Sequence, residues 1–456
     1  EGATVGKGET GRNELSKGKK GETLSSQTLP TDIRWIAEKA ATDPEFVFYT
    51  IVHYIDEVLL WDAFHRLRKD AASGIDGQTA AEYAQDLIAN LGDLHERLRT
   101  KQYRATVIKR SWLPKDDGSQ RPIGILILED KIVQKAVSIL LEAVFEVDFY
   151  DCSYGFRPTR NPHQALHAVR ELINKHNIGW ILDLDIRQFF DTLDREIFFD
   201  LLHERVKDGG IDRLIKEWFN AGIFDGEQLS HTERGTVQGG VVSPIIANIY
   251  LHYVVDEWFV KEVMPRMRGR CFIIRFADDV VMGFEYQEDA CRVREALLKR
   301  LEKYGLSAHS DKTRLVKFSR PCKGAEKDPQ NKTFDFLGFT HYWATSRKGH
   351  WVVKRRTIRK RQRRAIQRFE KWCKCNRHLS VKEQWQKLSI KLRGHYQYFG
   401  IRGNYDSLFW VYYKLKESWR RWLGRRSQKG TITWEKFHKI LENFPLPRPR
   451  IVQSWV

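Results

Sequence analysis

The stretch from Cys271 to Phe284 places two adjacent carboxylates between two apolar segments. These segments predict two short β-strands, so Asp278 and Asp279 are expected in the turn of a hairpin. Hairpins usually turn on Asn-Gly or Asp-Gly, and two carboxylates beside buried strands repel each other in a low-dielectric site. A bound divalent cation would relieve this repulsion. A solvated acidic turn is the alternative, and this segment alone does not decide between them.

A second acidic segment, Trp180–Asp191, also begins as an apolar run. Side chains alternate along a strand, so Asp183 and Asp185 are expected to project from the same face. Two carboxylates that point the same way from an apolar strand are unfavourable without a counter-ion. The pattern is compatible with a metal site and with structural salt bridges.

The positive charge of the chain is concentrated in one segment. The net charge of the 456 residues is +19, yet from Arg347 to Arg426 there are 25 Lys and Arg against 4 Asp and Glu. The rest of the chain is therefore close to neutral. The same segment is rich in Trp and Tyr, and basic residues interleaved with aromatic ones suit a phosphate backbone and stacked bases. A solvated helical surface with inward-facing aromatics is the alternative, and both can hold together.

The remaining composition is that of a globular protein. Hydrophobic residues make up 41% of the chain, and its 456 residues are enough for two or three domains. No apolar run reaches the length of a membrane span. The six cysteines show no zinc spacing, so reduced thiols and a cytoplasmic location are expected. Residues 1–30 are rich in Gly, Lys, Glu, Ser and Thr, which predicts a disordered tail.

Apolar periodicity and turn residues predict the other elements. Helices are expected within 31–69, 80–101, 129–148, 162–176, 194–221, 245–260 and 286–304, a hairpin at 109–124 and a strand at 334–339. In the hairpin, Lys115 and Arg121 flank an Asp-Asp-Gly turn and suit a phosphate group. Adjacent glycines at Gly239 and Gly240, just before a helix, permit close approach of a ligand, although a simple structural turn fits equally well.

Taken in order, these segments resemble the reverse transcriptase/maturase family encoded by bacterial group II introns, or a closely related group II-like reverse transcriptase. The resemblance covers roughly residues 45–450. Eight blocks carry it: Ser73–Gly77, Leu113–Lys115 with Arg121–Gly124, Asp151–Pro158, Asp183–Asp191, Gln238–Gly240 with Ser243–Pro244, Phe276–Asp279, Phe336–Phe339 and Leu392–Phe399.

This resemblance implies a metal-dependent active site. Asp185, Asp278 and Asp279 correspond to the catalytic residues and ligands of two Mg²⁺ ions, for which Mn²⁺ is a substitute, and the backbone carbonyl of Ile186 is a further ligand. The ions would activate the primer 3′-hydroxyl and neutralise the leaving pyrophosphate. Asp183 belongs to the motif but is expected to support the site rather than to bind metal.

The resemblance also implies a nucleotide site. Phe190 lies where the family has a steric gate that crowds a ribose 2′-hydroxyl and favours dNTPs. Lys115 and Arg121 match residues that hold the triphosphate, and Gln238 and Gly239 match the loop beneath the incoming nucleotide and template. Lys312 is expected near the leaving group as a proton donor.

Two residues depart from the family pattern. The hairpin reads Phe276-Ala-Asp-Asp where Tyr-Ala-Asp-Asp is usual, and Val237 stands where the family often has Pro. The first change removes one hydroxyl and leaves both carboxylates, and the second could alter the stiffness of a loop. Polymerisation is expected to survive both.

The implied fold is α+β, a right-hand polymerase with helical fingers, a palm carrying a small antiparallel sheet, and a helical basic thumb. The expected ranges are a tail at 1–30, an N-terminal extension and fingers at 31–178, a palm at 179–345, a thumb or maturase domain at 346–426 and a C-terminal extension at 427–456. Nucleic-acid-binding residues are expected in the thumb: Lys354, Arg355, Arg356, Arg359, Lys360, Arg361, Arg363, Arg364, Arg393, His395 and Tyr396.

The resemblance implies an RNA-directed DNA polymerase that also binds its host group II intron RNA and assists splicing and retrohoming. Its partners would be that intron RNA or another RNA template, a DNA primer or target DNA, and dNTPs, with no membrane. A second hypothesis is a domesticated relative in DNA repair, phage defence or CRISPR spacer acquisition. A third, of another class, is an RNA-binding splicing cofactor with a vestigial polymerase, against which the three aspartates argue.

Overall fold

The computed structural model describes residues 31–114, 120–226, 228–230, 235, 239–309, 313–322, 331–426 and 430–455. The expected disordered tail at 1–30 and the Asp-Asp-Gly turn of the first hairpin lie outside these residues. The chain divides into two compact units. Unit 1 contains the described residues of Glu1–Asn161, Leu184–Met282 and Glu288–Arg314, and unit 2 contains those of Pro162–Asp183, Gly283–Gln287 and Leu315–Val456.

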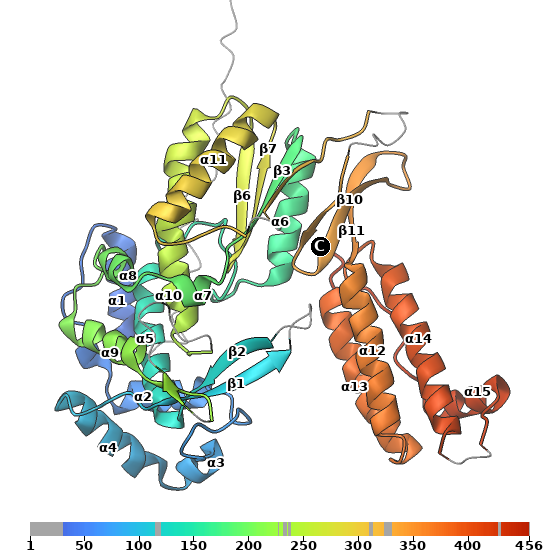
Figure 1. The fold of residues 1–456 in the computed structure, drawn as a ribbon, viewed down its shortest axis with the longest axis horizontal. Coiled ribbons are helices and arrows are strands. Elements are labelled where there is room, and N and C mark those ends of the chain that lie inside the picture. Colours follow the sequence, from blue (N-terminus) through green and yellow to red (C-terminus); the bar gives the residue numbers. More distant parts are fainter. Residues whose placement is uncertain are drawn as a thin grey trace, which may run out of the picture. The chain divides into compact units, whose positions relative to one another are not determined.

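Helices account for most of the described elements (Figure 1). The α-helices are α1 (Thr31–Thr42), α2 (Glu57–Arg66), α3 (Ala80–Tyr83), α4 (Leu87–Arg99), α5 (Leu128–Phe145), α6 (Pro162–Lys175), α7 (Phe189–Thr192), α8 (Arg195–Leu202), α9 (Gly209–Asn220), α10 (Ser243–Leu251), α11 (Gln287–Lys303), α12 (Arg359–Cys375), α13 (Val381–Phe399), α14 (Tyr405–Gly424) and α15 (Trp434–Asn443). The strands are β1 (Ile108–Pro114), β2 (Gln120–Ile125), β3 (Trp180–Asp185), β4 (Ile223–Phe224), β5 (Leu229–Ser230), β6 (Cys271–Phe276), β7 (Asp279–Phe284), β8 (Arg314–Lys317), β9 (Phe334–Phe336), β10 (Phe339–Thr345) and β11 (Trp351–Thr357).

The strands form three small sheets with the orders β2-β1-β4-β5, β11-β10-β9 and β6-β7-β3-β8. The expected hairpin at 109–124 is confirmed, because β1 and β2 pair antiparallel from Lys109–Ile125 to Pro114–Gln120. β4 joins β1 in parallel, while β10 is antiparallel to both of its neighbours. Mixed helices and small, mainly antiparallel sheets confirm the α+β class.

Two buried helices form the core of unit 1. α5 is buried along nearly its whole length and packs against α1, α2 and α10, and α10 also contacts α8. α10 is apolar on all sides, as expected of a helix enclosed by its own protein. The helix expected at 245–260 is confirmed, but beyond Leu251 it continues as π-helix at His252–Glu257 and Phe259–Val263. Such segments are rare and occur often at functional sites.

Unit 2 combines the β9–β11 sheet with the bundle of α12, α13 and α14. α12 and α13 both pack against α14, and α6 packs against β11 (Figure 1). The bundle core contains fully buried aromatics such as Tyr396 and Trp419, whereas Trp410 and Tyr413 are 48% and 39% exposed. The aromatic residues of the basic segment therefore divide between the core and the surface, as the sequence allowed.

Two expectations for this unit were wrong. Residues 334–339 are not one strand, because β9 ends at Phe336 and β10 begins at Phe339. Leu337 and Gly338 between them have φ of 48° and 86°, the positive values of a type I′ hairpin turn. Leu is unfavourable at positive φ, so only Gly338, and not Leu337, is a residue type that predicts this turn. The segment 346–426 is also not wholly helical, since it starts with β11.

His341 on β10 is an uncharged residue in the interior of unit 2. It is fully buried, stacks on Phe334 with ring centroids 4.6 Å apart, and pairs across the sheet with Arg355. Among the described residues neither of its ring nitrogens has a hydrogen-bond partner. Burial, and then the charge of Arg355, lowers the pKa of His341 from 6.5 to about 3, although the nearby backbone of Phe339 and Phe334 opposes this.

The lowered pKa predicts that acid destabilises the protein through His341. Between pH 6.5 and 3 the unfolded chain binds a proton at this residue and the folded chain does not, so the free energy of unfolding falls as the pH falls. From pH 7 to pH 5 the loss from this residue is about 2 kcal/mol. Urea denaturation at the two pH values should show that His341→Phe loses less stability than the wild type by this amount. Equal losses would contradict the buried, neutral state.

Candidate active site

The acidic hairpin consists of β6, a two-residue turn and β7, all as expected from its apolar flanks. β6 is buried except at Phe276, and β7 is buried from Val280 onward. The turn is formed by Ala277 and Asp278, one residue earlier than the expected Asp278-Asp279 turn, so Asp279 is already the first residue of β7. Ala277 has φ of 57°, a left-handed conformation that non-glycine residues rarely adopt and that often marks functional sites.

A loop of unit 1 fixes this turn from one side. The backbone of Cys152 and Tyr154 exchanges hydrogen bonds with Arg275, from Arg275 N–H to Cys152 O and from Tyr154 N–H to Arg275 O, both 2.8 Å. Gly155 then passes so close that a Cβ there would lie 2.2 Å from the backbone nitrogen of Ala277. Only glycine fits this contact, which explains why the aromatic loop Ser153–Pro158 contains it.

Arg275 is fully buried beneath the hairpin and holds several elements together. Its guanidinium donates to both carboxylate oxygens of Asp256, to Oδ1 at 2.8 Å and to Oδ2 at 2.6 Å, and to the side chain of Asn248 at 3.1 Å. It also donates to Ser153 Oγ at 2.8 Å and to the carbonyl oxygen of Ala277 at 3.1 Å. The strained turn is thus tied to a π-helical segment, to α10 and to the Ser153 loop.

The end of β3 brings a third carboxylate into unit 1. Asp185 is half-buried, and its backbone carbonyl accepts a hydrogen bond from His309 N–H at 2.8 Å. Arg187 N–H donates to Ser307 O at 2.8 Å, so Ile186 forms an antiparallel bridge with Ala308. In such a bridge the backbone groups of Ile186 point away from the partner strand. The carbonyl oxygen of Ile186 is therefore directed away from Ala308 and is not used in this pairing, which leaves it available as a ligand.

Asp185 and Asp278 lie within electrostatic range of each other. Loss of solvation is the main cause that raises the pKa of Asp278, although its surface is exposed to solvent, and the negative charge of Asp185 raises it further. Its own backbone N–H and the positive charges of Arg121 and Arg275 oppose this increase. The structure thus brings together carboxylates from β3 and the hairpin, with Arg121 of β2 within electrostatic range.

The part of the chain that the structure describes contains no group of three or more His, Cys, Asp or Glu side chains close enough to hold a metal ion. The donor atoms near the hairpin are nevertheless carboxylate oxygens, which suit hard divalent cations such as Mg²⁺. A cation between Asp185 and Asp278 would also offset the charge repulsion that raises the pKa of Asp278.

The described part of the expected nucleotide site lies in unit 1. Phe190 on α7 is half-buried and contacts Phe189 edge to face, with centroids 5.4 Å apart. A Cβ at Gly235 would lie 2.5 Å from the carbonyl oxygen of Phe190, and one at Gly239 would lie 2.7 Å from that of Gly124. Gly239 therefore packs directly on β2, the strand that carries Arg121. Lys115, Gln238 and Lys312 lie outside the described residues.

The residues expected to bind nucleic acid lie on β11, α12 and α13 of unit 2. The prediction was wrong for two of them, which are buried. Arg355 is 1% exposed and donates to the carbonyl oxygen of Leu166 at 3.2 Å. Tyr396 is fully buried and donates its hydroxyl to Pro447 O at 3.1 Å. Neither side chain can reach a bound RNA. His395 is half-buried, and the others are exposed or half-buried: Lys354, Arg356, Arg359, Lys360, Arg361, Arg363, Arg364 and Arg393.

The sequence analysis missed the residues that support the turn. Arg275, Asp256 and Asn248 were not identified, although an arginine inside the apolar run Cys271–Phe276 is itself a signal of a buried ion pair. Asp256 and Asn248 are likewise polar residues within a long apolar helix. Glycine in the loop Ser153–Pro158 was noted only as part of a family block.

Comparison with known proteins identifies the family of this chain. Residues 113–341, half of the chain, match the family described as reverse transcriptase (RNA-dependent DNA polymerase). Protein YkfC of Escherichia coli (strain K12) is 29% identical over 322 residues, which cover 62% of this chain and 83% of YkfC. Group II intron-encoded protein LtrA of Lactococcus lactis subsp. cremoris is 33% identical over 278 residues, or 57% of this chain and 46% of LtrA.

An uncharacterized 91 kDa protein in a cob intron of Schizosaccharomyces pombe is 36% identical over 163 residues, covering 36% of this chain and 20% of that protein. The chain thus spans most of YkfC but less than half of LtrA. The matched family region contains β3, the acidic hairpin and the loop before α10. This chain belongs to the reverse transcriptase (RNA-dependent DNA polymerase) family, and its relatives include a group II intron-encoded protein.

Proposed function

We propose that this chain copies RNA into DNA with Asp185, Asp278 and Asp279 as its catalytic residues. The observation that carries the proposal is the meeting of carboxylates from two separate strands beside a strained, tightly supported turn. A solvated acidic turn would need neither the buried Arg275 network nor the close approach of Gly155. Their presence supports a turn whose geometry has to be kept despite the repulsion between its charges.

The proposed cofactor is a pair of Mg²⁺ ions, for which Mn²⁺ can substitute. Asp185, Asp278, Asp279 and the backbone carbonyl of Ile186 would hold them, and this all-oxygen set fits hard cations. When bound, the ions supply activation of the primer 3′-hydroxyl and charge neutralisation at the leaving pyrophosphate. The residues of the chain hold the carboxylates in place, and Arg121 adds positive charge on the side of β2.

Binding of dNTPs is proposed to involve Lys115, Arg121, Gln238 and Gly239, with Lys312 as proton donor to the leaving group. Gly239 supports this arrangement because its close packing on Gly124 sets the loop before α10 against β2. The right-hand architecture is proposed in the same way, with fingers at 31–178, a palm at 179–345, a thumb at 346–426, and extensions at 1–30 and 427–456.

Phe190 is proposed to exclude ribonucleotides, and Phe190→Ala tests this role. Without the ring, a ribose 2′-hydroxyl gains room, and preference for dNTPs over rNTPs should fall about 10–100-fold. Single-nucleotide incorporation on an RNA template measures the ratio of kcat/KM values. DNA synthesis itself should continue, since Phe190 holds no catalytic group. An unchanged ratio would show that another residue selects the sugar.

The basic segment is proposed to bind group II intron RNA and to assist splicing and retrohoming. Two of the three similar proteins are named for introns, and the exposed cations of α12 suit a phosphate backbone. The binding residues proposed now exclude Arg355 and Tyr396, which are buried. No helix among the described residues is long and apolar enough to cross a membrane.

Primer extension tests the proposed polymerase. The wild-type chain, given a DNA primer annealed to an RNA template with dNTPs and Mg²⁺, should synthesise complementary DNA. Absence of extension would favour the splicing cofactor with a vestigial polymerase. Splicing of a group II intron RNA, measured with and without the chain, separates an intron-associated role from DNA repair, phage defence or spacer acquisition, since only the first predicts faster splicing.

A further inference from the structure

Helices α12 and α13 enclose a hollow of about 340 Å³ that is here called the basic pocket. Its lining comes from one face of each helix: Arg361, Arg364, Ala365, Arg368 and Phe369 on α12, and Lys391, His395 and Phe399 on α13. These spacings of three, four, seven and eight residues place side chains on one helical face. Ligand pockets in proteins range over about 300–1,000 Å³, so this one suits a single small ligand.

Aromatic rings lie at the inner part of the basic pocket. Phe369 is buried and belongs to the core of the bundle. The His395 ring lies 6.5 Å from that of Phe369 and 4.8 Å from that of Phe399, measured between centroids. Ala365 between the arginines is small and leaves room above these rings. The His395 and Phe399 rings are tilted by 35° and Phe369 meets His395 edge to face, so the pocket offers aromatic faces of the kind on which a nucleic-acid base stacks.

His395 adds hydrogen-bonding capacity without charge. Burial lowers the pKa of His395 from 6.5 to about 4, so its imidazole is neutral at physiological pH. A neutral imidazole has one N–H donor and one nitrogen acceptor. Such a group can recognise the polar edge of a base, whereas a charged imidazolium would favour an anion alone.

The outer part of the basic pocket is positively charged. Arg361 and Arg368 are exposed, and within the described residues neither has a carboxylate partner. Glu370, the single acidic residue in α12, instead accepts a hydrogen bond from Arg421 at 2.8 Å. Lys391 lies over the Trp372 ring, 5.9 Å from its centroid. Cations above an aromatic floor suit a base that is attached to a phosphate.

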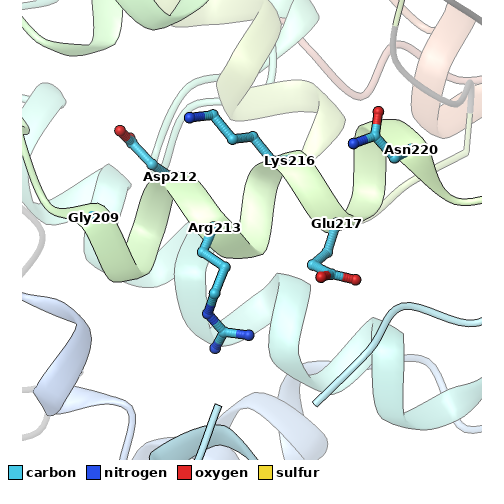
Figure 2. Close-up of a pocket in the computed structure, with 6 residues that line it drawn as sticks. All are labelled: Gly209, Asp212, Arg213, Lys216, Glu217 and Asn220. Carbon is cyan, nitrogen blue, oxygen red and sulfur yellow. The ribbon is translucent and has the colours of Figure 1, made fainter. Parts of the chain in front are cut away.

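Another hollow of similar size, about 320 Å³, lies along α9 and lacks these features. Figure 2 shows Asp212 and Lys216 on one side of α9, and Arg213 and Glu217 on the other. Asp212 contacts His203 at 2.8 Å, and Glu217 lies 3.7 Å from Arg104. The hollow along α9 is lined by residues of both charges and by no aromatic side chain, so it offers no site comparable to the basic pocket.

We propose that the basic pocket binds one unstacked nucleotide of single-stranded RNA, with the base against Phe369, His395 and Phe399 and the phosphates at Arg361, Arg364, Arg368 and Lys391. The inference deepens the proposed RNA-binding role of the basic segment and rests on it. Attraction between the positive charges of the segment and a phosphate backbone does not depend on whether the RNA carries bases. If the basic pocket holds a base, the affinity for RNA depends on the base as well as on the phosphates.

Fluorescence anisotropy with the full chain tests the pocket. The probes are a labelled single-stranded oligoadenylate and an abasic ribose-phosphate oligomer of equal length. Ala365→Phe fills the pocket and keeps every cation, so affinity for oligoadenylate should fall about 10-fold while affinity for the abasic oligomer stays the same. Gln367→Phe, on an exposed position of α12 outside the pocket, is the matched control and should bind both probes like the wild type.

A charge pair covers the case in which Ala365→Phe fails to fold. Arg368→Glu should weaken binding of both probes more than Lys371→Glu, because Lys371 is exposed on the same helix but outside the pocket. Adenosine monophosphate should compete with oligoadenylate for the wild type only at far higher concentration, since it lacks the rest of the strand. Tight binding of the mononucleotide, with oligoadenylate unaffected by Ala365→Phe, would assign the pocket to free nucleotides and overturn the proposal.

If the wild type and Ala365→Phe bind oligoadenylate with equal affinity, the proposal that the basic pocket holds a base is also overturned. The proposed polymerase can fail separately. If the wild type does not extend a primer, yet Ala365→Phe selectively loses oligoadenylate, the polymerase is contradicted and the pocket stands. If the wild type extends a primer, but Ala365→Phe binds oligoadenylate as tightly as the wild type, the polymerase stands and the pocket is contradicted.

Discussion

Asp278→Asn is expected to abolish DNA synthesis while the folded protein stays at least as stable as the wild type. The raised pKa of Asp278 shows that its negative charge is unfavourable there, through lost solvation and through Asp185. A neutral side chain of the same shape removes both the cost of lost solvation and the repulsion from Asp185. The same change removes a proposed metal ligand, and lost Lewis-acid stabilisation of several kcal/mol corresponds to a decrease in rate of about 1,000-fold or more.

Two measurements on one preparation separate these effects. Primer extension on an RNA template gives the rate, and thermal unfolding monitored by circular dichroism gives the Tm. Asp200→Asn, at an exposed position on α8, is the matched control and should leave both unchanged. Activity of Asp278→Asn close to that of the wild type would remove Asp278 from the catalytic residues. A loss of activity together with a large fall in Tm would give Asp278 a structural role instead.

Arg275→Met is expected to lower the free energy of unfolding by about 3–5 kcal/mol. The substitution leaves the carboxylate of Asp256 buried without its cation, at a position that is 0% exposed. It also removes the hydrogen bonds to Asn248, Ser153 and the carbonyl oxygen of Ala277. Unpaired charge in a protein interior costs far more than the methionine side chain gains. Urea denaturation measures the difference, and a loss below about 1 kcal/mol would contradict the network.

The double variant Arg275→Met/Asp256→Leu distinguishes support of the turn from stability. Replacing both charges with apolar side chains should recover much of the lost free energy, because no uncompensated charge stays buried. Ala277, with its positive φ, still loses the donor to its carbonyl. We therefore expect a folded double variant whose kcat for DNA synthesis is reduced while its KM for dNTP changes little. Full recovery of kcat would show that Arg275 acts on stability alone.

The sequence was most informative where apolar alternation and acidic residues coincide. β3 and the hairpin were predicted because their apolar runs are short and bounded, and the negative charge of Asp185 reaches Asp278. The supporting residues were missed because they come from distant segments. Arg275 meets Asn248 on α10, Asp256 in the π-helical continuation of that helix and Ser153 in a loop, and no local pattern links Arg275 to these positions.

Local signals also failed where tertiary packing decides. Leu337 occupies a turn position that favours Gly or Asn, so the β9–β10 hairpin looked like one strand. Arg355 and Tyr396 belong to a basic aromatic segment by composition, yet packing within unit 2 buries both. Composition predicts that such a segment is basic, but it does not show which of its residues face solvent.

Counting bound Mn²⁺ tests most directly whether the carboxylates of the hairpin and β3 form one metal site. Electron paramagnetic resonance can titrate Mn²⁺ into the wild-type chain held with primer, RNA template and a dNTP that cannot be joined to a terminated primer. We expect about two bound ions per chain, as in a two-metal site, and fewer in Asp278→Asn. Equal Mn²⁺ binding by the wild type and Asp278→Asn would contradict it.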